Sequence, residues 1–213
     1  NKGEKLMVND VSRAFFCAPA RRQVFVEIAP EDRVDGQDMV GELNYSMYGT
    51  RDAAQNWGEC CANTMTELGF YRGKASPCTF YHKESRLKTY IHGDGFVTIG
   101  KDEDLEWLRA GLEKSYEIKT EVLGPTQKDK QQVKVPNRII TWTKDGIEHE
   151  ADPRHAELVI KELHLTEAKG VTSPGTKDEG TTKPDRDELL EYGPAKEYLS
   201  LVARLNYLAP DRP

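Results

Sequence analysis

The sequence lacks several features that would fix its class at once. Its 213 residues contain no stretch near the ~20 consecutive apolar residues that cross a bilayer, and its start leads into no secretory segment, which predicts a soluble chain with no membrane partner. The four cysteines have no Cys-x-x-Cys spacing, which indicates neither a zinc site nor a disulfide framework and predicts reduced thiols in an intracellular compartment. With 30 basic and 36 acidic residues, the net charge of −6 provides no global positive field, so nucleic-acid binding would need a local patch.

The composition indicates a modest folded core. Nine Tyr, six Phe and three Trp, with 37% hydrophobic residues overall, argue against wholesale disorder. The length allows one domain or two small ones, because domains usually contain ~100–200 residues. The chain begins in a strand-like run at residues 6–8 and stops abruptly at 209–213, which predicts a fragment of a longer protein.

Apolar spacing in the first half predicts strands interspersed with two helices. A helix is predicted over 53–68, where apolar residues recur at three- and four-residue steps, Asp52 and Gln55 have capping-box spacing, and Gly69 follows. A second helix is predicted over 102–116, because three acidic residues stand in its first turn. Strands are predicted at 6–8, 24–28, 79–81, 89–91 and 96–99, the last two joined by a Gly-rich tip at 92–95.

The second half predicts a hairpin and two further helices. The hairpin runs from 133–142 to 147–150 around Asp145-Gly146, and a helix follows with Asp152 as its cap and Pro153 in its first position. Its inward-facing residues would be Ala156, Val159, Ile160 and Leu163. Residues 171–194, rich in Gly, Thr, Pro and charge, are typical of a linker. The last helical stripe would consist of Tyr198, Leu199, Val202, Leu205 and Leu208.

Two carboxylates are candidates for metal chemistry. Asp10 and Asp94 each follow a short apolar strand, a position from which carboxylates can converge at a sheet edge. Mg²⁺ prefers oxygen ligands and often takes one or two carboxylates together with substrate phosphates, so this pair suits phosphoryl transfer. The spacing alone also fits ordinary roles, because an Asp after a strand often caps a helix and Asp94-Gly95 suits a type I′ turn.

Six ordered blocks carry a resemblance to a known family. They are LMVNDVSRAFF with VFVEIAP, SMYGTRDAAQNW, LGFYRGKASPCTFY, the HGDG hairpin, LGP, and LSLVARLNYLAPDRP. Their order and spacing across nearly the whole chain resemble the reverse transcriptases of copia-type retrotransposons. The resemblance implies an RNA-directed DNA polymerase domain of a Pol polyprotein, with two Mg²⁺ ions in the ancestral mechanism.

The resemblance assigns roles to particular residues. Asp10 looks like the first metal-binding carboxylate of a polymerase palm, and Asp94 looks like the first member of the catalytic hairpin pair. Phe15 resembles the aromatic beneath the incoming sugar, and Lys119 resembles the basic residue near the departing pyrophosphate. From spacing alone, Phe15 could equally be a core residue and Lys119 a solvated one.

Other side chains could form a substrate-binding surface. Arg51 and Gln55 lie in the block that the family uses to face nucleotide and template. A template channel could be lined by the basic residues Arg13, Arg21, Arg22, Arg51, Arg72 and Lys74, with Phe70 and Tyr71 for stacking. Ordinary surface roles remain open for all of these residues.

The departures from the family pattern predict impaired catalysis. Gly95 stands where the second Asp of the hairpin pair is expected, which removes one carboxylate and one negative charge. Asp52 stands in the block that the family uses to face nucleotide and template, and it brings negative charge toward phosphates. Residues 135–138 differ from the Leu-Gly turn that the family often has in its primer-gripping hairpin. We also expect the fingers segment before the first Asp block and any ribonuclease H domain to lie outside this chain.

These inferences combine into one expected architecture. We expect an α+β fold with a palm-like antiparallel sheet and partial fingers over 1–124, a thumb-like hairpin and helix over 125–170, the linker over 171–194, and a C-terminal helix over 195–213 leading toward a connection and RNase H region. The expected partners are an RNA template, a DNA primer, deoxynucleoside triphosphates and other parts of a Pol polyprotein, in a cytoplasmic particle or the nucleus. The alternatives are a non-catalytic remnant that binds nucleic acid or protein, and a relic without function.

Overall fold

The computed structural model describes residues 3–34, 39–135, 138–171 and 191–211. Its largest element is a six-stranded antiparallel sheet in the order β4-β5-β6-β7-β1-β8. The strands of this sheet are β1 (Glu4–Val11), β4 (Phe70–Arg72), β5 (Thr79–His82), β6 (Lys88–His92), β7 (Gly95–Lys101) and β8 (Ile118–Leu123). The predicted hairpin around residues 92–95 is confirmed as β6 and β7.

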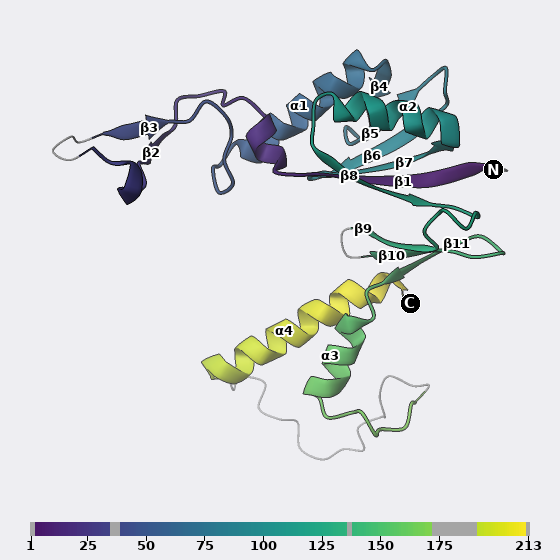
Figure 1. Cartoon of the computed structure of the whole chain (residues 1–213). Coiled ribbons are helices and arrows are strands. Elements are labelled where there is room, and N and C mark those ends of the chain that lie inside the picture. Colours follow the sequence, from purple (N-terminus) through teal and green to yellow (C-terminus); the bar gives the residue numbers. More distant parts are fainter. Residues whose placement is uncertain (1–2, 35–38, 136–137, 172–190, 212–213) are drawn as a thin grey trace. The chain divides into compact units, whose positions relative to one another are not determined.

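Two helices cover one face of this sheet (Figure 1). They are α1 (Ala53–Glu67) and α2 (Asp102–Glu113), and both appear where the apolar spacing predicts a helix. Their buried residues join the inward-facing residues of the strands in one core, in which Trp57, Leu108 and Phe96 are each at most 2% exposed. The opposite side of the sheet is called the outer face below.

Alternate residues of strand β1 point to the helix-covered face and to the outer face of the sheet. Successive side chains of a strand point to opposite faces, and Met7, Asn9 and Val11 are all buried on the helix-covered side. Asp10 falls between them in sequence and is exposed on the outer face. A carboxylate can therefore end a strand whose neighbouring residues belong to the core.

Smaller elements complete the described chain. A three-stranded sheet has the order β11-β10-β9, and β2 pairs with β3 in a two-stranded sheet. Their bounds are β2 (Phe25–Glu27), β3 (Val40–Glu42), β9 (Gln132–Val135), β10 (Arg138–Trp142) and β11 (Ile147–Ala151). Short 3-10 helices occur at η1 (Ala14–Cys17), η2 (Pro30–Asp32) and η3 (Ala209–Asp211). The described fold is thus mixed, with antiparallel sheets and four α-helices.

The chain divides into two compact units, residues 1–136 with 141–147 and residues 137–140 with 148–213. In the second unit, α3 (Arg154–Glu162) packs against α4 (Tyr192–Leu208). Among the described residues, no helix combines the length and apolar content needed to cross a membrane. The boundaries predicted from the sequence at 124, 170 and 194 stay predictions.

Several local predictions in the first unit are wrong in detail. No capping box forms at α1, because the Asp52 side chain makes no cap hydrogen bond and its carboxylate instead accepts bonds from Arg22 and Asn56. The second helix ends at Glu113, three residues earlier than predicted, although Tyr116 remains buried.

The helices of the second unit also differ from the prediction. Asp152 caps α3 as predicted, because its carboxylate accepts a hydrogen bond from the backbone N–H of Arg154 at 3.1 Å. The helix begins at Arg154, one residue later than the predicted start at Pro153. Ile160 and Leu163 are more than 40% exposed rather than inward-facing, and Val159 is buried. Helix α4 begins at Tyr192 instead of 195, and Leu208 alone of its predicted stripe is buried. Residues 172–190, which are most of the predicted linker, lie outside the described residues. So do residues 136–137, which belong to the segment 135–138 that departs from the family's primer-gripping hairpin.

Candidate functional site

The candidate site is built on a row of residues that crosses four strands of the outer face. Strand register pairs Asp10 with Gly95 on one side and with Lys119 on the other, and Gly95 in turn pairs with His92. Directly opposed residues in antiparallel strands project to the same face. The register therefore places Asp10 beside Lys119 on the side of the sheet away from α1 and α2.

Two hydrogen bonds fix the turn that carries Asp94. The backbone N–H of Val11 donates to the Asp94 carbonyl oxygen at 3.0 Å, which ties the turn to the end of β1. The indole N–H of Trp57 donates to the Gly93 carbonyl oxygen at 2.7 Å, which ties the turn to α1. Gly93 has φ of 60°, a left-handed conformation that glycine adopts without steric cost. Asp94 is thus an exposed residue on an anchored turn.

These residues surround one pocket of about 530 Å³. Its lining includes Asp10, Asp94, Lys119 and His92, which come from three separate regions of the sequence. The two carboxylates are oxygen donors of the kind that Mg²⁺ prefers, so the donor set fits one such ion completed by water or phosphate. No group of three or more His, Cys, Asp and Glu side chains that could hold a metal ion occurs in the described parts of the chain.

Gly95 occupies the middle of the row and leaves room for a side chain. A Cβ atom built there would lie 3.4 Å from the His92 carbonyl oxygen, which is an ordinary contact, and the backbone of Gly95 has no positive φ. A carboxylate at this position would project to the same face as Asp10, its partner in register. The absence of an acid at position 95 is therefore not imposed by the backbone.

Phe15 lies outside the lining of this pocket. It is part of η1, and its ring centroid is 4.4 Å from that of Tyr48. The residue is partly buried and packs against the main core. This contact joins two sequence blocks that carry the family resemblance, LMVNDVSRAFF and SMYGTRDAAQNW.

Arg51 and Gln55 also lie outside the lining of the pocket with Asp10 and Asp94. Arg51 is exposed in the turn before α1, and Gln55 lines a separate surface hollow of about 360 Å³ with Arg72. Asp52, between them, forms an ion pair with Arg22 at 3.0 Å. Partial burial opposes ionisation of Asp52, but a bond to its own backbone and the Arg22 guanidinium outweigh that effect and hold its pKa below the usual value.

Two other basic residues predicted for a template channel are engaged in ion pairs. Arg13 pairs with Glu117 at 2.9 Å and Arg21 pairs with Glu59 at 2.6 Å. The Arg21 guanidinium holds the pKa of Glu59 below its usual value. These contacts use positive charge within the protein, so less of it is available for phosphates.

Sequence reasoning missed three polar residues of the pocket lining, Asn9, Glu121 and Lys134. Glu121 lies two residues after Lys119 in β8, and the two-residue period of strands could have placed both on one face. Asn9 is fully buried; its amide donates to the Thr120 hydroxyl at 2.8 Å, and its Oδ1 has no hydrogen-bond partner. No pattern in the sequence singled out Asn9.

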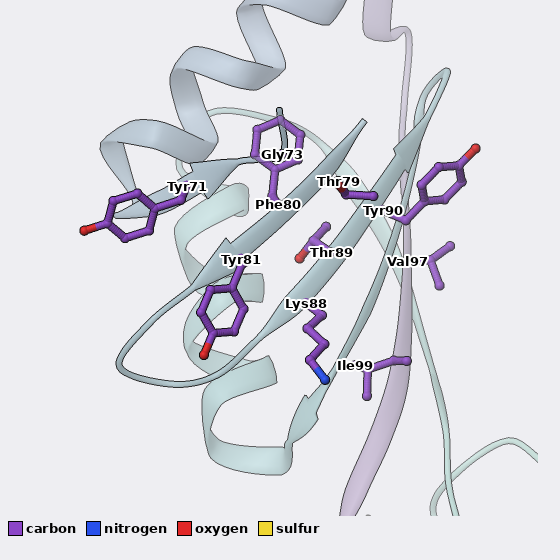
Figure 2. Close-up of a pocket in the computed structure, with 10 residues that line it drawn as sticks. All are labelled: Tyr71, Gly73, Thr79, Phe80, Tyr81, Lys88, Thr89, Tyr90, Val97 and Ile99. Atoms are coloured by element: carbon purple, nitrogen blue, oxygen red, sulfur yellow. The ribbon is translucent and has the colours of Figure 1, made fainter. Parts of the chain in front are cut away.

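A second pocket of about 490 Å³ lies on the outer face and contains three exposed tyrosines. Figure 2 shows Tyr71, Tyr81 and Tyr90 on β4, β5 and β6 together with Lys88. Val97 lines both this pocket and the one with Asp10, so the two adjoin. Of the two aromatics predicted for stacking, Tyr71 is 65% exposed, whereas Phe70 is buried in the core.

Comparison with known proteins shows a distant similarity to a retroelement protein. No protein-family model matches the chain. Over 170 residues, the chain is 26% identical to the "Retrovirus-related Pol polyprotein from transposon TNT 1-94" of Nicotiana tabacum. The alignment covers 78% of this chain and 12% of that polyprotein, so the chain spans a small part of its relative. This similarity supports an origin in the Pol polyprotein of a retroelement.

Proposed function

We propose that this chain is the palm region of a copia-type reverse transcriptase, an RNA-directed DNA polymerase, with impaired catalysis. The observation that carries the proposal is the convergence of Asp10 and Asp94, 84 positions apart, on one pocket of the outer face. The similarity to a retrotransposon Pol polyprotein supports it independently. The antiparallel sheet backed by two helices is compatible with a palm.

The residues have distinct proposed roles. Asp10 and Asp94 would hold Mg²⁺, which when bound stabilises charge on the transferring phosphate. Lys119, beside Asp10 in the register, would attract the pyrophosphate end of a deoxynucleoside triphosphate. Phe15 would contact the sugar, and Arg51 and Gln55 would contact template or nucleotide from the segment before and within α1.

Gly95 is the proposed cause of impairment. Two carboxylates suffice for one ion, but two ions need a further acidic ligand, and the pocket lacks one at the position next to Asp10. Loss of even an outer partner of a metal ligand typically costs ~10–100-fold in affinity or activity. RNA-templated DNA synthesis by this chain should therefore be weak or absent.

Primer extension on an RNA template tests this function. Gly95→Asp should extend a DNA primer faster than the wild type by ~10–100-fold, because it restores a ligand carboxylate. Gly95→Asn is the matched control, since it adds a side chain of similar size without charge. Adding Asp10→Asn to Gly95→Asp should abolish the gain. Equal rates for the Asp and Asn variants would contradict the proposal.

A second candidate function is a non-catalytic remnant that binds nucleic acid or a protein. The exposed tyrosines of the outer face favour it, because aromatic rings on a sheet can stack with bases. Its expected signature is salt-dependent binding to a primer–template duplex without any Mg²⁺-dependent extension, including by Gly95→Asp.

A further inference from the structure

Two cysteines from distant parts of the sequence meet where η1 packs against α1. Cys17 is the last residue of η1, and Cys60 lies in the middle of α1. The Cys60 Sγ is 3.7 Å from the Cys17 carbonyl oxygen, within hydrogen-bonding range for sulfur. Both residues are partly buried and pack against the same core. The Cys60 thiol therefore lies against the backbone of Cys17 and is near enough to affect the ionisation of the Cys17 thiol.

The neighbours of the two thiols differ. The Cys60 Sγ lies 3.6 Å from the Tyr116 hydroxyl, which also contacts the Thr64 hydroxyl at 2.6 Å. Cys17 lies beside Arg13 and Glu117 and lines a surface hollow of about 360 Å³ with them. A small reagent can thus approach Cys17 through this hollow, whose lining does not include Cys60.

We propose that Cys17 and Cys60 form an oxidant-sensitive dithiol that closes to a disulfide when the chain meets hydrogen peroxide. The link would join the segment after Asp10 to α1, the helix whose Trp57 anchors the turn carrying Asp94. Such a cross-link between distant residues stabilises a fold chiefly by constraining the unfolded chain. This proposal does not depend on polymerase activity.

The chemistry balances with peroxide as the oxidant. The Cys17 thiolate attacks one peroxide oxygen, the O–O bond breaks, and hydroxide leaves a sulfenic acid on Cys17. The Cys60 thiolate then attacks the Cys17 sulfur, the S–O bond breaks, and a second hydroxide leaves as the S–S bond forms. The two thiol protons convert the hydroxides to water. The sulfurs lose two electrons in total, and the peroxide gains them.

The reaction should accelerate as the pH rises. Burial, followed by the nearby Cys60 thiol, raises the pKa of Cys17, and Arg13 offsets this only in part. Because the thiolate is the nucleophile, its fraction at neutral pH is small and grows as the pH approaches that raised pKa. Burial raises the pKa of Cys61 far more, which makes that neighbour inert.

Peptide mapping of the full chain under non-reducing conditions tests the proposal. After treatment with hydrogen peroxide, we expect a cross-linked peptide containing Cys17 and Cys60 in the wild type and in Cys78→Ser, the control at an exposed cysteine. The cross-link should be lost in Cys17→Ser and in Cys60→Ser. The melting temperature of the wild type should rise on oxidation and fall back with dithiothreitol, and neither serine variant should show this change.

Phenylarsine oxide provides a second probe that needs no oxidation. Its arsenic binds two neighbouring thiols together, so the wild type should retain it against a monothiol competitor and each serine variant should release it. A wild-type map showing sulfinic or sulfonic acid at Cys17 without a link to Cys60 would overturn the proposal. A cross-link that involves Cys78 or Cys61 instead would also overturn it.

Discussion

A buried side chain provides one of the two hydrogen bonds that anchor the turn carrying Asp94. Trp57 is 2% exposed, and its indole N–H reaches the Gly93 carbonyl oxygen at 2.7 Å. Trp57→Phe should remove this bond while keeping an aromatic ring in the core. We expect a loss of about 1 kcal/mol in the free energy of unfolding, measured by urea denaturation, as for one hydrogen bond.

Hydrogen exchange would locate the effect of Trp57→Phe. Exchange in the β6–β7 turn should accelerate relative to the centres of β1 and β7. Trp107→Phe is the matched control, because Trp107 is 44% exposed and lies on α2. Equal changes in turn exchange for the two variants would show that Trp57 does not hold the turn.

Ionisation of Asp129 should make the stability of the fold depend on pH. Partial burial raises its pKa, but hydrogen bonds from Thr126 and Lys5 outweigh this, and the net pKa is lowered. A carboxylate with a lowered pKa stabilises the fold above its unfolded pKa of ~3.9, and this contribution is lost as the pH falls through the folded pKa. The urea midpoint should therefore fall below about pH 4.

Asp129→Asn checks the assignment of this pH effect. The ion pair with Lys5 at 3.0 Å should contribute up to ~1 kcal/mol near neutral pH, and the variant should lose it there. The variant should also show a weaker fall in stability between pH 5 and pH 3 than the wild type. An unchanged pH profile would assign the acid sensitivity to other carboxylates.

Residue type and local pattern single out Asp10 and Asp94, whereas Lys119 follows only from the family resemblance. The structure brings all three to the lining of one pocket, with Asp10 and Lys119 in strands and Asp94 in the turn between β6 and β7, and their roles stay predictions. Arg51 and Gln55 were chosen from a family block, and they lie outside that pocket, because the exposed face of a helix start depends on packing that the block does not encode. Glu121 follows the same period as Lys119 and could have been found.

At the scale of elements, β7 packs closely at Gly100 against Leu87, which directly precedes β6. A Cβ atom at that position would lie 2.2 Å from Cδ2 of Leu87, which is fully buried and cannot move away freely. Gly100→Ala should therefore lower the free energy of unfolding by ~1–3 kcal/mol through overpacking. Chemical denaturation measures the change.

Gly58→Ala is the matched control for Gly100→Ala. Gly58 lies within α1, and a Cβ atom there would have no heavy atom within 4 Å. The substitution should raise stability by ~0.5–1 kcal/mol, because alanine favours helix and glycine does not. Equal destabilisation by both variants would contradict the close packing of Gly100 against Leu87.

Helices α1 and α2 and strands β1, β5, β6 and β7 have clear apolar patterns, and all of them lie where the sequence predicts them. Strands β3, β4 and β8 are not predicted from the sequence, because β3 and β4 have three residues each and β8 has polar residues at its centre. Helix α3 has the same kind of pattern, yet Ile160 and Leu163 are exposed, because the local period does not specify which partner covers a helix. The starts of α3 and α4 were each displaced by one to three residues.

At the scale of the whole molecule, charge limits how nucleic acid can bind. The net charge is −6, and Arg13, Arg21 and Arg22 are paired with acids. Filter binding to a primer–template duplex should therefore be weak and should decline as salt rises, with a shallow slope that reflects few phosphate contacts. Tyr90→Ala should weaken binding at every salt concentration without changing the slope, because stacking releases no counterions.

A matched change in charge completes this binding test. Lys88→Ala removes one positive charge from the tyrosine-lined pocket. The slope of log binding constant against log salt concentration should become shallower by the equivalent of about one phosphate contact. If Tyr90→Ala and Lys88→Ala both bind as the wild type does, nucleic acid does not use this part of the outer face.

Binding of Mn²⁺, a spectroscopic stand-in for Mg²⁺, tests the central claim most directly. Electron paramagnetic resonance should detect weak binding by the wild type, ~10–100-fold tighter binding by Gly95→Asp, and loss of binding in Asp10→Asn and in Asp94→Asn. Asp145→Asn, in the turn before β11, should bind as the wild type does. Wild-type binding by Asp10→Asn and Asp94→Asn, with no gain in Gly95→Asp, would contradict a metal site on the outer face.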